Sequence, residues 1–163
     1  MPDLPTFKTI LYASDLGANT RPVFRSALSI ARKYEADIIM IHVVEPMSPA
    51  TQAIVETYLA DVDAKKVYKD NMKEVLSTMK KRLLKFSEEE LSSNNIESVQ
   101  VREILVKSGK TSEEIIKAAE KYKVDLIILG KSTRSIFGSD VAGSAARRVS
   151  RYSPVPVMIV PNT

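Results

Sequence analysis

The amino-acid sequence predicts an α/β fold with a single doubly wound sheet of five parallel strands and helices on both faces. Two observations carry this prediction. Apolar segments of strand length alternate along the chain with amphipathic segments of helix length. Two of these segments, 37–44 and 125–129, are almost continuously apolar, which is typical of strands covered on both faces. Parallel neighbours need a crossover helix between them, and the alternation supplies these helices. At 163 residues the chain has the length of one domain of ordinary size, so we expect one domain over residues 1–163.

The first predicted strand and helix lie within residues 7–34. Residues 7–13 are rich in β-forming side chains and end at a polar turn, so they predict a strand. Asn19 or Thr20 can cap the following helix, and Pro22 suits its first turn. Apolar residues then recur at intervals of four, three and four, at Val23, Ala27, Ile30 and Tyr34. This spacing predicts a helix with one buried face.

The second predicted strand, 37–44, is followed by a long connection and a long helix. Residues 46–63 contain two prolines and small polar residues, and we expect a connection with a short helical piece over 53–59. Its length is unusual in a compact domain and indicates a lid or an interface. In residues 64–91, lysines and glutamates are expected to face water. The apolar stripe of this predicted helix consists of Tyr68, Met72, Val75, Met79, Leu83 and Phe86.

The remaining segments complete the sheet. Thr111 and Glu114 have the spacing of a capping box, in which each side chain bonds the other residue's backbone N–H. The predicted elements are strands at 99–106, 125–129 and 156–160, a helix from Thr111 through Tyr122, and a helix over 143–151. With right-handed crossovers we expect a Rossmann-like strand order 3-2-1-4-5, which places 156–160 at an edge.

Composition argues against several classes of function. The chain has no cysteine, which removes disulfides and thiolates, and its one histidine, His42, has no partners for a zinc site or a triad. The net charge is +4, and the one cationic cluster, Arg147, Arg148 and Arg151, lacks interleaved aromatic residues, so we expect a solvated or intersubunit surface and no nucleic-acid partner. There is neither a signal peptide nor an apolar run of about 18 residues, so we expect a cytoplasmic protein that does not span a membrane.

Polar and small residues follow the predicted strands where ligands bind in such sheets. Asp15 follows the first strand and can accept hydrogen bonds from an adenine amino group or a ribose hydroxyl, or cap its own turn. Val43 can form an apolar wall for a base, or belong to the core. The sequence therefore predicts a crevice beside Asp15, Val43 and Gly130.

Glycines flank the last predicted helix where phosphates would sit. Gly130 ends the fourth strand, and Gly143 and Ser144 open the helix, where unpaired N–H groups favour an anion. The Ser144 hydroxyl can donate to a phosphate or cap its helix. Lys131 and Arg134 can neutralise phosphate charge, or lie in a solvated loop.

Two other patterns are rejected as functional motifs. Gly109, Lys110 and Thr111 imitate the end of a Walker A loop, but Ile104 stands where that motif needs a glycine. No paired carboxylates have the arrangement of an acid and a base, so we expect no catalytic residue.

Over essentially its whole length the chain resembles the universal stress protein family. Nucleotide-binding members have a Gly-x-x-Gly-x9-Gly-Ser/Thr signature after the fourth strand, and this chain has Gly130, then Thr133, then nine residues, then Gly143 and Ser144. Asp15, His42-Val43, Ser108-Gly109 and the strand 156–160 also agree with the family pattern. The resemblance implies a site for ATP or AMP, with Mg²⁺ held through the phosphates. Its implied binding residues are Ala13, Ser14, Asp15, Val43, Gly130, Lys131, Thr133, Gly143, Ser144 and Ala145.

Thr133 stands where the signature has its second glycine. Which functional interpretation holds depends on whether this threonine permits nucleotide binding. Forcing a β-branched residue into a glycine conformation costs roughly 1–3 kcal/mol, or about one to two decades in dissociation constant. The first interpretation is a regulatory nucleotide-binding module, and the second is a nucleotide-free dimeric interaction protein. A third is a slow ATPase, for which the sequence offers no base. The resemblance also implies a homodimer through the edge strand 156–160.

Overall fold

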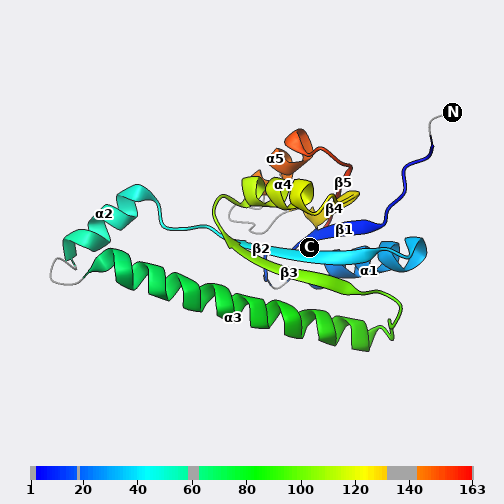
Figure 1. The fold of residues 1–163 in the computed structure, drawn as a ribbon, viewed down its shortest axis with the longest axis horizontal. Helices are drawn as coiled ribbons and strands as arrows, with labels where there is room; N and C mark the ends of the chain where they lie inside the picture. Colours follow the sequence, from blue (N-terminus) through cyan, green and yellow to red (C-terminus); the bar gives the residue numbers. More distant parts are fainter. Residues whose placement is uncertain (1–2, 18, 59–62, 132–142, 163) are drawn as a thin grey trace.

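The computed structural model describes residues 3–17, 19–58, 63–131 and 143–162. It contains a five-stranded parallel sheet in the order β3-β2-β1-β4-β5, which confirms the predicted fold (Figure 1). The strands are β1 (Thr9–Ala13), β2 (Asp37–Val44), β3 (Val101–Ser108), β4 (Leu126–Gly130) and β5 (Val157–Val160). Their predicted limits differ from these by at most two residues.

Four of the five described helices cover the two faces of the sheet, and α2 lies beyond it (Figure 1). They are α1 (Arg21–Tyr34), α2 (Pro49–Tyr58), α3 (Ala64–Ser93), α4 (Thr111–Lys121) and α5 (Ser144–Tyr152). Alternate residues of the inner strands point to opposite faces, as the two-residue period of a strand requires. Ile10 and Tyr12 therefore pack with α1 and the second half of α3, whereas Leu11 packs with α4 and α5.

The start and the end of α1 differ from the sequence prediction. Thr20 occupies the N-cap position, but neither it nor Asn19 caps the helix with a side chain. The Thr20 hydroxyl instead donates to the carbonyl of Gly17 at 3.2 Å. Tyr34, predicted on the buried face, is 44% exposed, because it is the last helical residue and packs its ring edge-on against Phe7.

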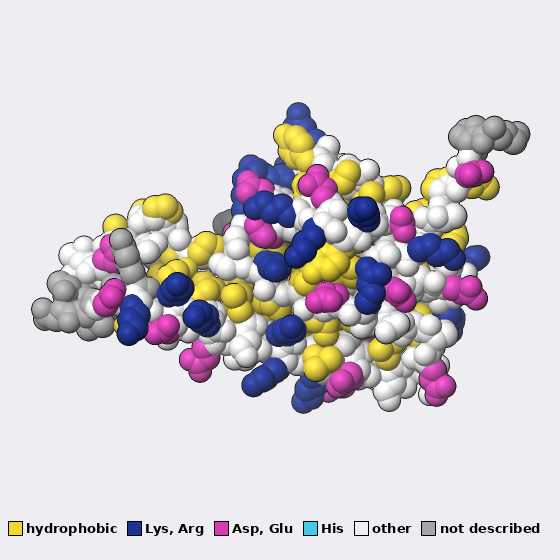
Figure 2. All heavy atoms as spheres, in the orientation of Figure 1, with side chains coloured by type: hydrophobic (Ala, Val, Ile, Leu, Met, Phe, Trp, Pro, Cys, Tyr) yellow, Lys and Arg dark blue, Asp and Glu magenta, His cyan; other side chains and the backbone are white. Residues whose placement is uncertain are grey.

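The connection between β2 and α3 contains more helix than predicted. Helix α2 starts at Pro49 instead of residue 53, while the predicted end at Leu59 lies outside the described residues. No residue of α2 is buried, and in Figure 1 α2 and the first turns of α3 extend beyond the sheet. Val75, predicted on the buried stripe, is consequently 38% exposed. Figure 2 shows basic and acidic side chains interspersed over the face of the molecule that is turned toward the viewer. The lid or interface role of this connection stays a prediction.

Glu90 is a second exception in α3, since the glutamates of this helix were predicted to face water. Its side chain is fully buried between α3 and α1. Arg25 Nε donates to Glu90 Oε2 at 2.8 Å, and Arg21 Nη1 lies 3.1 Å from Oε1 in an ion pair without the geometry of a directed hydrogen bond. Both arginine side chains are about half exposed, at 55% and 52%. Asn94 Nδ2 also donates to Oε2, at 3.4 Å, so α1 supplies the opposite charges while Asn94 adds a neutral hydrogen bond.

Candidate functional site

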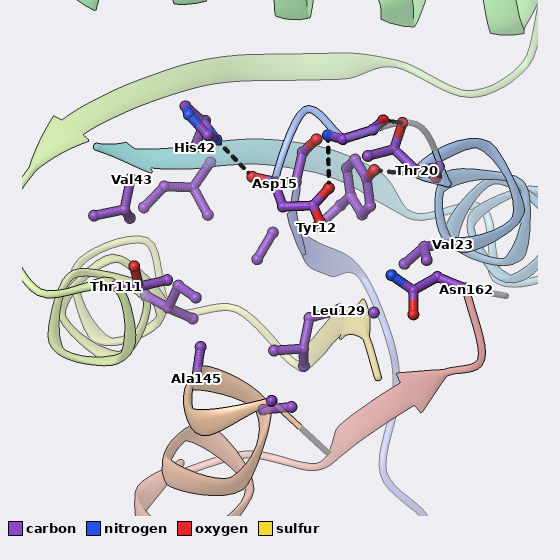
Figure 3. Close-up of a pocket in the computed structure, with 18 of the residues that line it drawn as sticks. Tyr12, Asp15, Thr20, Val23, His42, Val43, Thr111, Leu129, Ala145 and Asn162 are labelled. Carbon is purple, nitrogen blue, oxygen red and sulfur yellow. Dashed lines mark hydrogen bonds between the residues drawn. The ribbon is translucent and has the colours of Figure 1, made fainter. Parts of the chain in front are cut away.

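The carboxyl ends of β1, β2 and β4 and the start of α5 surround a cavity of about 620 Å³ (Figure 3). Nine of the ten implied binding residues line this cavity: Ala13, Ser14, Asp15, Val43, Gly130, Lys131, Gly143, Ser144 and Ala145. Thr133 and the loop residue Arg134 lie outside the described residues. The cavity has the size of a small-molecule site, and it lies where ligands bind in doubly wound sheets.

The turn after β1 is shaped by two side-chain caps. The Ser14 hydroxyl accepts a hydrogen bond from the N–H of Leu16 at 3.1 Å, and Asp15 Oδ1 accepts one from Gly17 N–H at 2.9 Å. Between them Leu16 has φ 56°, a left-handed conformation that costs a non-glycine residue about 1–2 kcal/mol. Asp15 therefore does cap its turn, as one alternative predicted. It uses one oxygen, and among the described residues no donor is bonded to Oδ2.

His42 connects the end of β2 to this turn. Its Nδ1 donates to the carbonyl of Ser14 at 2.7 Å, and because a carbonyl only accepts, this nitrogen carries the proton. The Ser14 N–H in turn donates to the carbonyl of Ile41 at 2.9 Å. His42 thus has a structural role here, since its hydrogen bond connects the end of β2 to the turn after β1. It also brings Val43 and Asp15 to the same edge of the cavity (Figure 3).

Tyr12 forms part of the cavity floor and was not singled out by the sequence. Its hydroxyl donates to the carbonyl of Thr20 at 3.4 Å. Burial raises the pKa of Tyr12 well above its ordinary value; a hydrogen bond with Ser14 opposes the rise, and the charges of Asp15 and Glu90 add to it. The phenol is therefore neutral in the folded protein throughout the physiological range.

The raised pKa of Tyr12 predicts a loss of stability in alkali. Above about pH 10 the unfolded chain ionises this phenol while the folded protein keeps its proton, so the free energy of unfolding falls as the pH rises. Below that pH the two states bind the proton equally and the contribution is constant. We expect Tyr12→Phe to reduce the fall between about pH 10 and pH 11.5, as measured by urea unfolding. An identical pH profile for the two proteins would contradict this.

The start of α5 is held by backbone contacts to the ends of two strands. The N–H of Lys131 donates to the Val160 carbonyl at 2.8 Å, and the N–H of Gly143 donates to the Lys131 carbonyl at 2.8 Å. The first intrahelical bond is that of Arg147 to Gly143, at 3.1 Å. Gly143 is the N-cap and Ser144 the first helical residue, without a side-chain cap, so the capping alternative for Ser144 is wrong. The N–H groups that open α5 therefore favour an anion.

The predicted capping box at α4 is also wrong, because Glu45 occupies its place. The N-cap is Lys110, which makes no side-chain cap. Glu45, directly after β2, accepts hydrogen bonds from the N–H and hydroxyl of Thr111 at 3.2 and 3.0 Å. Glu114 instead pairs with Lys117 at 2.9 Å. No local pattern could reveal Glu45, since its partner is 66 residues away.

A second cavity adjoins the first. It has a volume of about 510 Å³ and shares Glu45, Thr111, Ser144 and Ala145 with the larger cavity. The segment from Pro46 to Pro49 contributes to its wall. Part of the long connection thus lies beside the candidate site.

Neither a metal cluster nor a membrane helix is found in the part of the chain that the structure describes. There, no group of three His, Cys, Asp or Glu residues could hold a metal ion. Within the same residues, every helix is too short or too polar to cross a bilayer.

The chain is similar to proteins of one family over nearly its whole length. The universal stress protein family matches residues 6–161. Universal stress protein A of Salmonella typhi is 30% identical over 158 residues, covering 95% of this chain and 94% of the relative. A universal stress protein in complex with cAMP has a TM-score of 0.62 at 18% identity, covering 97% of this chain and 99% of the other. One from Archaeoglobus fulgidus in complex with dAMP has a TM-score of 0.52 at 18% identity, covering 96% and 98%.

The structural similarities show a shared fold, and the sequence matches show the family. The shared fold agrees with the strand order β3-β2-β1-β4-β5. On the strength of the family match over residues 6–161, this chain belongs to the universal stress protein family.

Proposed function

We propose that this protein is a regulatory module of the stress response, a single domain over residues 1–163 that binds ATP or AMP and is not an enzyme. The observation that carries the proposal is the convergence of nine implied binding residues on one cavity of about 620 Å³. Structures of the same fold in complex with cAMP and dAMP support an adenine nucleotide as the ligand.

Each part of the cavity has a chemistry that suits a different part of the ligand. The Oδ2 atom of Asp15 can accept a hydrogen bond from the adenine amino group, and Val43 can pack against the base. The opening N–H groups of α5 and the Ser144 hydroxyl can bind phosphate oxygens. Lys131 adds a positive charge beside them, and Mg²⁺ would be held through the phosphates of ATP.

Regulation would follow from linkage between ligand binding and conformation or assembly. A nucleotide that binds one conformation or oligomer more tightly shifts the population toward it by its differential affinity. No bond in the nucleotide needs to break for this signal. The expected output is therefore a change of shape or of partner, without turnover.

A thermal-unfolding scan with Mg-ATP tests this proposal. At about 100 times its dissociation constant the ligand should add roughly 2.7 kcal/mol, which raises the midpoint by about 5–10 °C in a domain of this size. Mg²⁺ alone and Mg-GTP serve as controls. Thr133→Gly, measured in parallel, should show a shift at least as large, because glycine removes any backbone constraint of the threonine.

The thermal shifts of the unmodified protein and of Thr133→Gly, taken together, distinguish the competing functions. A shift in the unmodified protein supports a working nucleotide site. A shift only in Thr133→Gly would mean that the site has lapsed on an intact scaffold. No shift in either protein would refute the proposal and favour the nucleotide-free interaction protein.

We further propose that the protein forms a homodimer through β5. Among the residues that the structure describes, β5 pairs only with β4 and has no strand along its other edge, and Met158 of this strand is 38% exposed. Val157 and Ile159 pack against the core beside α4 and α5, so a charge there would damage the fold itself. We therefore expect Met158→Lys to give a folded monomer by light scattering, with Met158→Leu remaining dimeric. Equal masses for the two variants would refute this interface.

A further inference from the structure

We propose that Asn162 is a positioning residue of the nucleotide site and that its side chain forms part of the wall of this site. This inference rests on the proposed function and adds a residue to it. Asn162 follows β5 and is only 6% exposed, although it is polar and almost the last residue of the chain. Its side chain lines the large cavity, near Val23 in Figure 3.

Asn162 explains why position 130 is a glycine. A Cβ atom on Gly130 would lie 2.9 Å from Asn162 Nδ2 and 3.2 Å from Cγ, closer than such atoms normally approach. It would also lie 3.4 Å from a methyl group of Val23, which is an ordinary contact. The space that a side chain at position 130 would need is therefore occupied by the carboxamide.

The backbone fixes this arrangement on both sides of the contact. Gly130 pairs with Val160 in the sheet, and the next residue, Lys131, donates to the Val160 carbonyl at 2.8 Å. The Lys131 carbonyl then accepts from Gly143, the N-cap of α5. The position of Asn162 is thus tied to the end of β4 and to the N–H groups that open α5.

This explanation differs from one in which the ligand requires the glycine. If a phosphate had to approach the Gly130 backbone, a side chain there would weaken binding whatever stands at position 162. If Asn162 imposes the requirement, Gly130→Ala should be harmful only while the carboxamide is present. A double-mutant cycle therefore distinguishes the two explanations.

The cycle consists of Gly130→Ala, Asn162→Ala and the double variant, each measured for thermal midpoint and for Mg-ATP affinity by calorimetry. We expect Gly130→Ala alone to lower the midpoint by about 2–10 °C and the affinity about tenfold, through overpacking against the carboxamide. In the Asn162→Ala background, Gly130→Ala should lower the thermal midpoint and the binding free energy by less than about a third of these amounts. Equal losses in both backgrounds would overturn the proposal.

Asn162→Asp tests whether the side chain lies close to the ligand, because a purely structural residue would not change how affinity depends on ligand charge. The change preserves shape and places a negative charge in the cavity wall, so the loss of affinity should grow with ligand charge, from little for adenosine to about tenfold for AMP and more for ATP. Gln100→Glu, an exposed position at the amino end of the sheet, is the charge-matched control and should change none of these affinities.

The outcomes separate this inference from the proposed function. Suppose that the unmodified protein binds ATP but Asn162→Asp lowers the affinities for adenosine and ATP by the same factor. The inference about Asn162 is then wrong, and the proposed nucleotide site still stands. If the unmodified protein binds neither adenosine nor ATP, both are wrong.

Discussion

Replacing both Arg21 and Arg25 with alanine is expected to destabilise the fold by about 3 kcal/mol, since removing the partners of a buried charge leaves it uncompensated. Glu90 is fully buried, and these two side chains supply its ion pairs, at 3.1 and 2.8 Å. The arginines are half exposed, so water can partly replace them, and we place the effect at the lower end of the usual 3–5 kcal/mol range. Urea unfolding with a constant m-value measures the loss.

Glu90→Gln is the matched control for this pair. It removes the charge instead of its partners, and the two arginines can then be hydrated, so we expect a smaller loss of about 1–2 kcal/mol. Adding Glu90→Gln to the double arginine variant should restore stability, because no buried charge then remains. If the triple variant is as unstable as the double variant, the destabilisation has another cause, such as lost packing of the arginine stems.

The fold could be predicted because its signals are local. The nearly continuous apolar segments at β2 and β4 predicted buried parallel strands, and the helical segments between strands predicted their crossovers. The caps and the charged pairs could not be predicted in this way. Arg25 and Glu90 are 65 residues apart, and Glu45 and Thr111 are 66 apart, so only the folded sheet brings them together.

The same distinction holds at the candidate site. Asp15, Val43 and Gly130 were predicted to share a crevice because parallel strands end at one edge of the sheet, and all three line the cavity. Tyr12 and Asn162 were missed, because a tyrosine inside a strand and an asparagine after the last strand have no local pattern. The structure also shows that Asp15 caps its turn through Oδ1, while no donor among the described residues is bonded to Oδ2, a distinction that the sequence could not make.

Asp15→Ala is expected to reduce the affinity for ATP about 10- to 100-fold, because a hydrogen bond to a charged group contributes about 1.5–3 kcal/mol. A carboxylate only accepts, so Oδ2 suits the amino group of adenine and repels the carbonyl oxygen that guanine has at that position. Asp15→Asn should therefore lower the affinity for ATP and also reduce the ratio of the ATP affinity to the GTP affinity. Calorimetry measures both affinities. Equal weakening of both nucleotides would indicate that Asp15 contacts the ribose.

Asp125→Ala is the control that separates binding from turn stability. Asp125 Oδ2 accepts hydrogen bonds from the N–H groups of Lys8 and Thr9 at 2.8 and 2.9 Å, at the amino end of the sheet and away from the cavity. Its removal should lower the thermal midpoint, as the loss of the Asp15 cap also should, without changing nucleotide affinity. If both variants lose affinity in proportion to their loss of stability, Asp15 is a structural residue. A loss of affinity confined to the Asp15 variant would instead place the ligand against Asp15 Oδ2, since a loss of stability could not account for it.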